Sequence, residues 1–405
     1  DPARGYTRDI EIIAEQILPW AFAGRIPLIT NGGGLNPVGA AAAVRQTAER
    51  LGLHGLKIGV VQGDDLLGRL PELRAGGEAL AHLETGEPLP ADGPPILTAS
   101  AYLGAQPIVA ALAQGADMVI TGRVADPSLY LAPMVHRYGW AADDWNRLAS
   151  GIICGHLLEC TGQVVGGNSL ASIARAEGAA LANPGYPIGE VDEDGAFTIT
   201  KVPDTQGWVT RDTVKEQLLY EMHDPGAYIT PDVVADVTTL RLADDGPDRV
   251  RVRGVSGHPR TGSLKVNLAW LEGYSRELIF ALGWPDVWRK EAQLREMLAA
   301  SWAGLPLARV QYQHLGLDSL YGPLRPPPND PLELVVRVMF TAGDPGTLKA
   351  AVRRAMALGL SGPAGMAVSG TTVGAEPRPL LGLWPALVRR EPVEAGVMVT
   401  VEEVP

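Results

Sequence analysis

Cysteine is scarce in this 405-residue chain: Cys154 and Cys160 are its only two, and they do not form a Cys-x-x-Cys pair. This excludes a disulfide framework and a cysteine-based zinc site, and a reducing cytosol suits such free thiols best. No apolar run approaches the roughly 20 residues needed to span a bilayer, and no secretory signal peptide is visible. We therefore expect a cytoplasmic protein without membrane insertion.

Positive charge is also scarce, since the formal net charge is −12. No basic stripe is present to neutralise phosphates, which excludes nucleic acid as a partner. We expect a small anionic molecule as the ligand instead, and a homo-oligomer as the assembly. With 46% hydrophobic residues, the chain is long enough for two or three domains that each bury a core.

The order of strand and helix patterns predicts an α/β protein with three parts. Residues 1–183 alternate apolar strands with helices, which indicates a domain built on a mostly parallel sheet. Residues 184–262 carry short alternating strand patterns between turn residues, which predicts a β-rich antiparallel insert. Residues 263–405 follow the order βαββαβ, with the last strand at 396–401, which is typical of a split βαβ or ferredoxin-like α+β domain.

A glycine-rich loop, Asn31-Gly-Gly-Gly-Leu-Asn-Pro37, joins a strand pattern at 26–30 to a helix pattern at 38–51. A glycine turn that leads into a helix N-terminus suits an anion, because backbone N–H groups can approach the ligand closely. The expected substrate-binding residues of the loop are Asn31, Gly32, Gly33, Gly34 and Asn36. The alternative is a glycine-rich connection without a ligand.

A second loop, Gly122-Arg-Val-Ala-Asp-Pro127, repeats this design after a strand pattern at 117–121. We expect Asp126 to cap the following helix and Pro127 to be its first residue. Because the carboxyl ends of neighbouring parallel strands lie at one edge, both loops should face one cleft, to which Arg123 brings positive charge.

A third strand pattern, at 57–62, ends in Asp64 and Asp65 and adds carboxylates to the same edge. We expect Asp64 to bind substrate and Asp126 to be catalytic, although each aspartate could equally serve only as a helix cap. With Glu159, these side chains could also supply oxygen ligands to a divalent metal ion, but no ligand spacing fixes a metal site.

The segment GIICGHLLEC, which ends at Cys160, combines an imidazole, a carboxylate and a thiol. On a helix, His156, Glu159 and Cys160 would share one broad face. This trio could transfer protons through His156 and Glu159, and Cys160 could act as a nucleophile if a positive neighbour lowered its pKa. We name all three as catalytic candidates. The alternative is that His156 and Glu159 satisfy each other in the core and that Cys160 is a small hydrophobe.

Three later turns carry further candidates for substrate binding. Asn168, which follows two glycines, is either a left-handed turn residue or a hydrogen-bond partner of the substrate. Tyr186, in the turn Pro-Gly-Tyr-Pro, and Tyr228, in Asp-Pro-Gly-Ala-Tyr, each either line the crevice or pack a loop onto the core.

Six ordered blocks of the chain resemble the acyclic terpene utilisation AtuA family: GGGLNP, GDDLL, GADMVITGRVADPSL, GHLLECTGQVVGGN, PGYPIGEV and EQLLYEMHDPGAYITPDV. The resemblance covers most of the chain and implies a role in the catabolism of branched acyl-CoA thioesters or terpenoid acids. Family members usually have a further strand–helix segment upstream of the position of Asp1, and many have an additional small C-terminal domain.

Two classes of function fit these observations. The first is an enzyme that performs acid–base chemistry, of the hydratase, dehydratase or isomerase type, on a small carboxylate or a coenzyme A thioester. The second is a non-catalytic acyl-CoA-binding or scaffold subunit, in which the proton-transfer cluster would be core. We favour the enzyme.

Overall fold

The computed structural model describes residues 5–90, 93–175, 178–324 and 326–405. The fold is mixed α/β, as expected, and contains both parallel and antiparallel strands. It divides into two compact units, of which the first contains Asp1–Leu89, Thr98–Leu268 and Pro385–Pro405. The second contains Pro90–Leu97 and Ala269–Trp384. None of the described helices is long and apolar enough to cross a bilayer.

The first unit is built on a four-stranded sheet with the order β1-β4-β2-β17. Its strands are β1 (Leu28–Thr30), β4 (Met118–Thr121), β2 (Lys57–Gln62) and β17 (Met398–Glu403). Neighbours are parallel from β1 to β2, whereas β17 lies antiparallel to β2. The prediction that residues 396–401 form the last strand of a separate C-terminal domain is therefore wrong, because β17 completes the first sheet instead.

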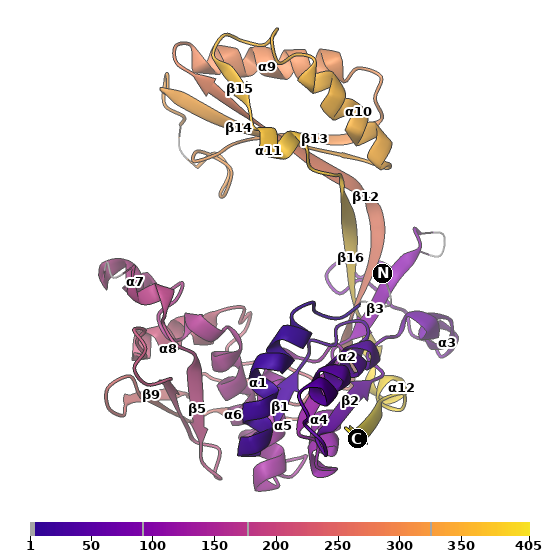
Figure 1. Ribbon diagram of the computed structural model, residues 1–405, viewed down its shortest axis with the longest axis vertical. Helices are drawn as coiled ribbons and strands as arrows, with labels where there is room; N and C mark the ends of the chain where they lie inside the picture. Colours follow the sequence, from indigo (N-terminus) through magenta and orange to yellow (C-terminus); the bar gives the residue numbers. More distant parts are fainter. Residues whose placement is uncertain (1–4, 91–92, 176–177, 325) are drawn as a thin grey trace. The chain divides into compact units, whose positions relative to one another are not determined.

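Helices pack on both faces of this sheet, as residue alternation along β2 requires. Ile58 and Val60 join a core with α1 (Ile10–Gly24) and α2 (Pro37–Arg50), which lie side by side in Figure 1. Gly59 points the other way, where an added Cβ would lie 3.1 Å from Ala111 of the helix α4. On this face α4 (Gln106–Ala113) packs on the sheet, α5 (Asp126–Tyr138) packs against α4, and α6 (Trp145–Glu159) packs against α5.

The β-rich part, expected as an antiparallel insert, forms two small antiparallel sheets. One has the order β5-β6-β10-β9, and the other β11-β8-β7. Their bounds are Pro187–Val191 (β5), Phe197–Lys201 (β6), Tyr228–Ile229 (β7), Val234–Asp236 (β8), Arg241–Asp244 (β9), Val250–Arg253 (β10) and Ser256–His258 (β11). A helix, α8 (Arg211–Leu219), begins at a capping box formed by Thr210 and Thr213. These sheets belong to the first unit.

The second unit contains an antiparallel sheet of the order β13-β14-β12-β15, with two helices, α9 and α10, on one face (Figure 1). This is the strand order of a split βαβ unit, in which the short strand β15 takes the place that we assigned to 396–401. Phe280 and Phe340 are central to the core under the helices. The elements are β12 (Ser263–Gly283), α9 (Val287–Ser301), β13 (Leu307–His314), β14 (Glu333–Ala342), α10 (Pro345–Met356) and β15 (Met366–Val368).

Short helices and further strands connect these parts. The strands β3 (Ile96–Ala101) and β16 (Arg378–Arg389) both pair with β12. The short helices are η2 (Leu67–Arg69), α3 (Leu70–Ala75), η3 (Thr161–Gln163), α7 (Leu170–Arg175), η4 (Ala180–Ala182), α11 (Gly370–Val373) and α12 (Arg390–Glu394).

Candidate functional site

A cavity of about 480 Å³ lies within the first unit, where the start of α5 meets the end of α6. Among the residues considered from the sequence, Asp126, Glu159 and Tyr228 line it. Its other lining residues are Leu83, Tyr102, Ala125, Pro127, Glu221, Tyr228, Ile229, Thr230, Pro231, Thr261, Ser263, Leu264, Lys265 and Leu387. A second cavity of about 490 Å³, beside β1 and α5, has Arg137 as the one charged residue among its described lining and lacks an acid–base pair.

Glu159 is the last residue of α6 and contacts His156 one turn earlier on the helix. The His156 side chain is fully buried and that of Glu159 is 13% exposed; Nδ1 of the imidazole lies 3.1 Å from Oε1 of Glu159. The other ring nitrogen, Nε2, lies 3.1 Å from the backbone carbonyl oxygen of Leu218. The hydroxyl of Tyr228, a cavity residue, lies 3.4 Å from Nδ1.

These contacts decide where a proton is held. A carbonyl oxygen can only accept, so Nε2 of His156 carries a hydrogen and donates it to Leu218. A neutral imidazole would then present a lone pair at Nδ1 towards Oε1 of Glu159. A lone pair and a carboxylate oxygen repel each other, so a proton lies between the two groups, on His156 or on Glu159. The pair therefore stores a proton at the wall of the cavity.

Burial raises the pKa of the Glu159 carboxyl group, because the charged form loses hydration. The hydrogen bond and charge of His156 oppose this shift, whereas Asp126 and Glu221 raise the pKa further. Burial also raises the pKa of the Tyr228 phenol, so Tyr228 keeps its proton. A carboxyl group whose pKa rises towards neutrality can both take up and release a proton.

Asp126 reaches the cavity from the start of α5, but it does not cap the helix as we expected. The cap position is Ala125, without a side-chain hydrogen bond, and Asp126 is the first helical residue. The Asp126 carboxylate instead accepts a hydrogen bond of 2.7 Å from the side-chain amide of Asn31. The loops after β1 and β4 thus lie at the same sheet edge, as expected, although Asn31 does not line the cavity.

The glycine-rich loop is tightly packed against the chain itself. Backbone N–H groups of Gly32, Gly34, Leu35 and Asn36 all donate to oxygen atoms of the chain. A Cβ atom on Gly33 would lie 2.5 Å from the carbonyl oxygen of Thr121, so this glycine permits the close approach of β4. Asn36 caps α2 by accepting from the N–H of Gly39. Contact between this loop and a substrate stays a prediction.

Asp64 contacts the second loop at Arg123, which belongs to that loop. The buried carboxylate of Asp64 accepts a hydrogen bond of 2.7 Å from the backbone N–H of Arg123, and burial raises its pKa. An added Cβ on Gly122 would lie 2.3 Å from Oδ1 of Asp64, so the approach requires glycine. Neither Asp64 nor Arg123 is among the described residues that line the cavity. The Arg123 guanidinium lies 5.5 Å from the ring centroid of Tyr102, which does line it.

The remaining candidates lie apart from this arrangement. Cys160 follows the end of α6 rather than lying on the helix, and burial raises the pKa of its thiol. The condition for a reactive thiolate, a lowered pKa, is therefore not met. Asn168 has φ +51° and is therefore a left-handed turn residue, while its contact with a substrate stays a prediction; Tyr186 is 68% exposed. None of the three is among the described residues that line the cavity.

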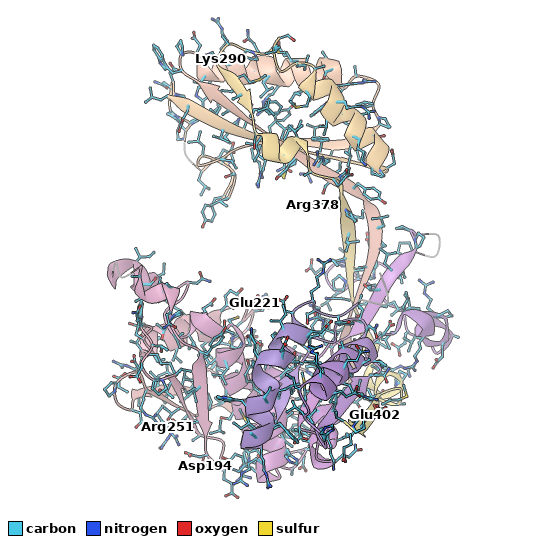
Figure 2. The ribbon with its side chains drawn as sticks, in the orientation of Figure 1. Asp194, Glu221, Arg251, Lys290, Arg378 and Glu402 are labelled. Carbon is cyan, nitrogen blue, oxygen red and sulfur yellow. The ribbon has the colours of Figure 1, made fainter. Side chains whose placement is uncertain are left out.

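Sequence reasoning did not consider three ionisable residues of the cavity, Tyr102, Glu221 and Lys265, and it weighed a fourth, Tyr228, without selecting it. They come from distant segments, so no spacing connects them with Glu159. Glu221 follows α8 in a left-handed conformation with φ +57° and lies at the surface of the unit (Figure 2). An unusual backbone conformation at a non-glycine residue is one signal of a functional position, but it is not readable from sequence.

The carboxylates considered as metal ligands are not gathered in one place. Asp64 accepts from Arg123, Asp65 accepts from Leu67, and Asp126 accepts from Asn31. Within the described parts of the chain, no three His, Cys, Asp or Glu side chains are grouped so that they would hold a metal ion.

Comparison with known proteins agrees with the six sequence blocks. Searches of the curated proteins and of the solved structures found no match. A family model described as "Acyclic terpene utilisation family protein AtuA" matches residues 1–399, almost the whole chain. The chain therefore belongs to the acyclic terpene utilisation AtuA family.

Proposed function

We propose that the protein is an enzyme of branched or terpenoid acid catabolism that moves a proton at a carbon next to a carbonyl group. The substrate would be a small carboxylate or a coenzyme A thioester, and the reaction would be of the hydratase, dehydratase or isomerase type. Family membership supports the pathway. The observation that carries the chemistry is the buried Glu159–His156 pair at the cavity wall.

Glu159 is positioned to exchange the proton with the substrate. Its Oε1 faces His156, whereas its buried Oε2 has no hydrogen-bond partner among the described residues. An unpartnered carboxyl oxygen in a poorly hydrated site is a strong proton acceptor, because nothing else stabilises its charge. His156 shares a hydrogen bond with Glu159, and Tyr228 and Asp126 line the same cavity and can orient the substrate.

The test is hydrogen exchange in deuterated water, read by mass spectrometry. Branched acyl-CoA thioesters and their free acids are incubated with the wild type, with Glu159→Gln and with Glu49→Gln, an exposed glutamate on α2 that serves as the control. We expect deuterium incorporation with the wild type and the control, and a loss of about 10²–10⁴-fold in rate with Glu159→Gln.

The scaffold hypothesis makes the opposite prediction. A non-catalytic acyl-CoA-binding subunit would bind one of these thioesters without exchanging its hydrogens. Binding without exchange, or full exchange activity in Glu159→Gln, would contradict the proposed function.

A further inference from the structure

Two cations lie over the ring of Tyr102 in the cavity wall. The Cζ atom of Arg123 is 5.5 Å from the ring centroid, and Nζ of Lys265 is 5.7 Å from it. The side chain of neither cation forms an ion pair with the described residues, in contrast to most arginines of the β-rich part, such as Arg249 and Arg251. Both residues are exposed, and a cation–π contact at an exposed site is weak, so the two positive charges remain available to an anion.

Backbone hydrogen bonds join the main chain of both residues to the segment that carries the ring. The N–H of Tyr102 donates to the carbonyl oxygen of Lys265 at 2.9 Å, and the N–H of Leu103 donates to that of Arg123 at 3.3 Å. The Tyr102 hydroxyl is held by Asn267, whose side-chain amide donates to it at 3.1 Å. The two cations therefore emerge from adjacent, paired segments rather than from independent loops.

The basic group is distinct from the acidic group around Glu159. The charges that act most on Glu159 come from His156, Asp126 and Glu221, and neither of the two cations is among them. Lys265 nevertheless lines the same cavity as these carboxylates. The cavity thus has an acidic part around Glu159 and a positive charge, Lys265, beside Tyr102, whereas Arg123 contacts Tyr102 without being among the described lining residues.

We propose that Lys265 and Arg123 bind an anionic group of the substrate at a distance from its reacting carbon. An oxyanion at the cavity wall would accept a charge-assisted hydrogen bond from Lys265, and Arg123, which also contacts the ring of Tyr102, would add positive charge beside it. The group is a carboxylate or a phosphate, which share this chemistry. The assignment of the reacting end to Glu159 rests on the proposed function, whereas the anion site itself rests on the contacts around Tyr102.

Calorimetric titration with paired probes tests the site. Monomethyl glutarate is compared with methyl valerate, which lacks the carboxylate, and phosphopantetheine is compared with pantetheine, which lacks the phosphate. The proteins are the wild type, the double variant Lys265→Gln/Arg123→Gln, the conservative Lys265→Arg and the control Lys215→Gln, an exposed lysine paired with Asp212. We expect the double variant to bind the matching anionic probe about 10- to 100-fold more weakly, and the neutral partner unchanged.

The two arms identify the source of the anion, since loss in the first arm indicates a carboxylate and loss in the second a phosphate. Lys265→Arg and Lys215→Gln should bind like the wild type. Equal affinity of the wild type for the charged and neutral probes, or equal binding by the double variant, would overturn the proposal. Binding of the probes does not require proton transfer, so a failure of the deuterium-exchange experiment leaves this result intact and can be told apart from it.

Discussion

The side-chain amide of Asn31 donates a hydrogen bond of 2.7 Å to the carboxylate of Asp126, across 95 positions of sequence. The two residues follow neighbouring parallel strands, β1 and β4, whose register pairs Thr30 with Ile120. This contact fixes a cavity carboxylate through a residue that does not itself line the cavity. The glycine-rich loop therefore connects to the site through its first side chain rather than through its backbone N–H groups.

The energetic coupling of Asn31 and Asp126 can be measured with a double-mutant cycle. Asn31→Ala and Asp126→Ala each remove the same hydrogen bond, so their combined effect on unfolding should be smaller than the sum. We expect a coupling free energy of about 0.5–1.5 kcal/mol, because a net hydrogen bond contributes about that much. Urea unfolding of the wild type and the three variants gives the value. Strict additivity would show that the contact is absent in solution.

Gly122→Ala should destabilise the fold, because the new Cβ would lie 2.3 Å from Oδ1 of the buried Asp64. Overpacking of this kind typically costs about 1–3 kcal/mol. Gly68→Ala is the matched control, since nothing lies within 4 Å of an added Cβ there. Thermal unfolding of both variants provides the comparison. A melting temperature for Gly122→Ala equal to that of Gly68→Ala would contradict the close approach of Asp64 to the loop.

The strands and capped helices of the first sheet were predictable because their signals are local. The strand pattern at 57–62 coincides with β2, and Asn36 caps α2 as its position before Pro37 predicts. The βαββαβ pattern likewise gave the strand and helix order of the second unit up to α10. It failed at the last strand, because β17 pairs with β2 from more than 300 positions away, and residue patterns do not encode the choice of sheet.

The candidate site was predictable in part for the same reason. The spacing of His156 and Glu159 on one helix correctly predicted their contact. Tyr102, Glu221 and Lys265 join them only through the fold, so their place in the cavity was not readable. Asp126 was misassigned as a cap because Asp before Pro is a common helix start. In the structure its carboxylate instead accepts a hydrogen bond from the side-chain amide of Asn31.

The pH dependence of stability should reveal the raised pKa of Glu159. The folded chain binds a proton at this carboxyl group more tightly than the unfolded chain does. Its contribution to stability is therefore present below the unfolded pKa and is lost as the pH rises through the folded pKa. Relative to Glu159→Gln, the wild type should lose stability over this window. Urea unfolding of both proteins from about pH 4 to about pH 8 measures the difference. A gain in stability of the wild type relative to Glu159→Gln would mean that His156 lowers the pKa of Glu159 by more than burial raises it.

His156 should act as a positioning residue, and two variants separate this role from a merely structural one. His156→Ala leaves the buried Leu218 carbonyl and Oε1 of Glu159 without their partner, at a cost of about 1–3 kcal/mol for each group. His156→Asn retains a polar group near Nδ1 but cannot carry a positive charge. The charge of His156 lowers the pKa of Glu159, so its removal should raise that pKa. With His156→Asn, the acid limb of the rate profile should shift to higher pH. An unchanged pH profile would assign His156 to the core.

Cys160 should be dispensable for the reaction, because burial and nearby carboxylates raise the pKa of its thiol. Cys160→Ser should therefore retain activity within a few-fold of the wild type, since no thiolate is lost. Alkylation by iodoacetamide, followed by mass spectrometry, tests the same point. At neutral pH, Cys160 should react more slowly than a free cysteine. Cys154, fully buried and with a pKa raised to about 12, should react only when the protein unfolds and serves as the internal control. Rapid alkylation of Cys160 with parallel loss of exchange activity would instead place a reactive thiol beside the Glu159–His156 pair.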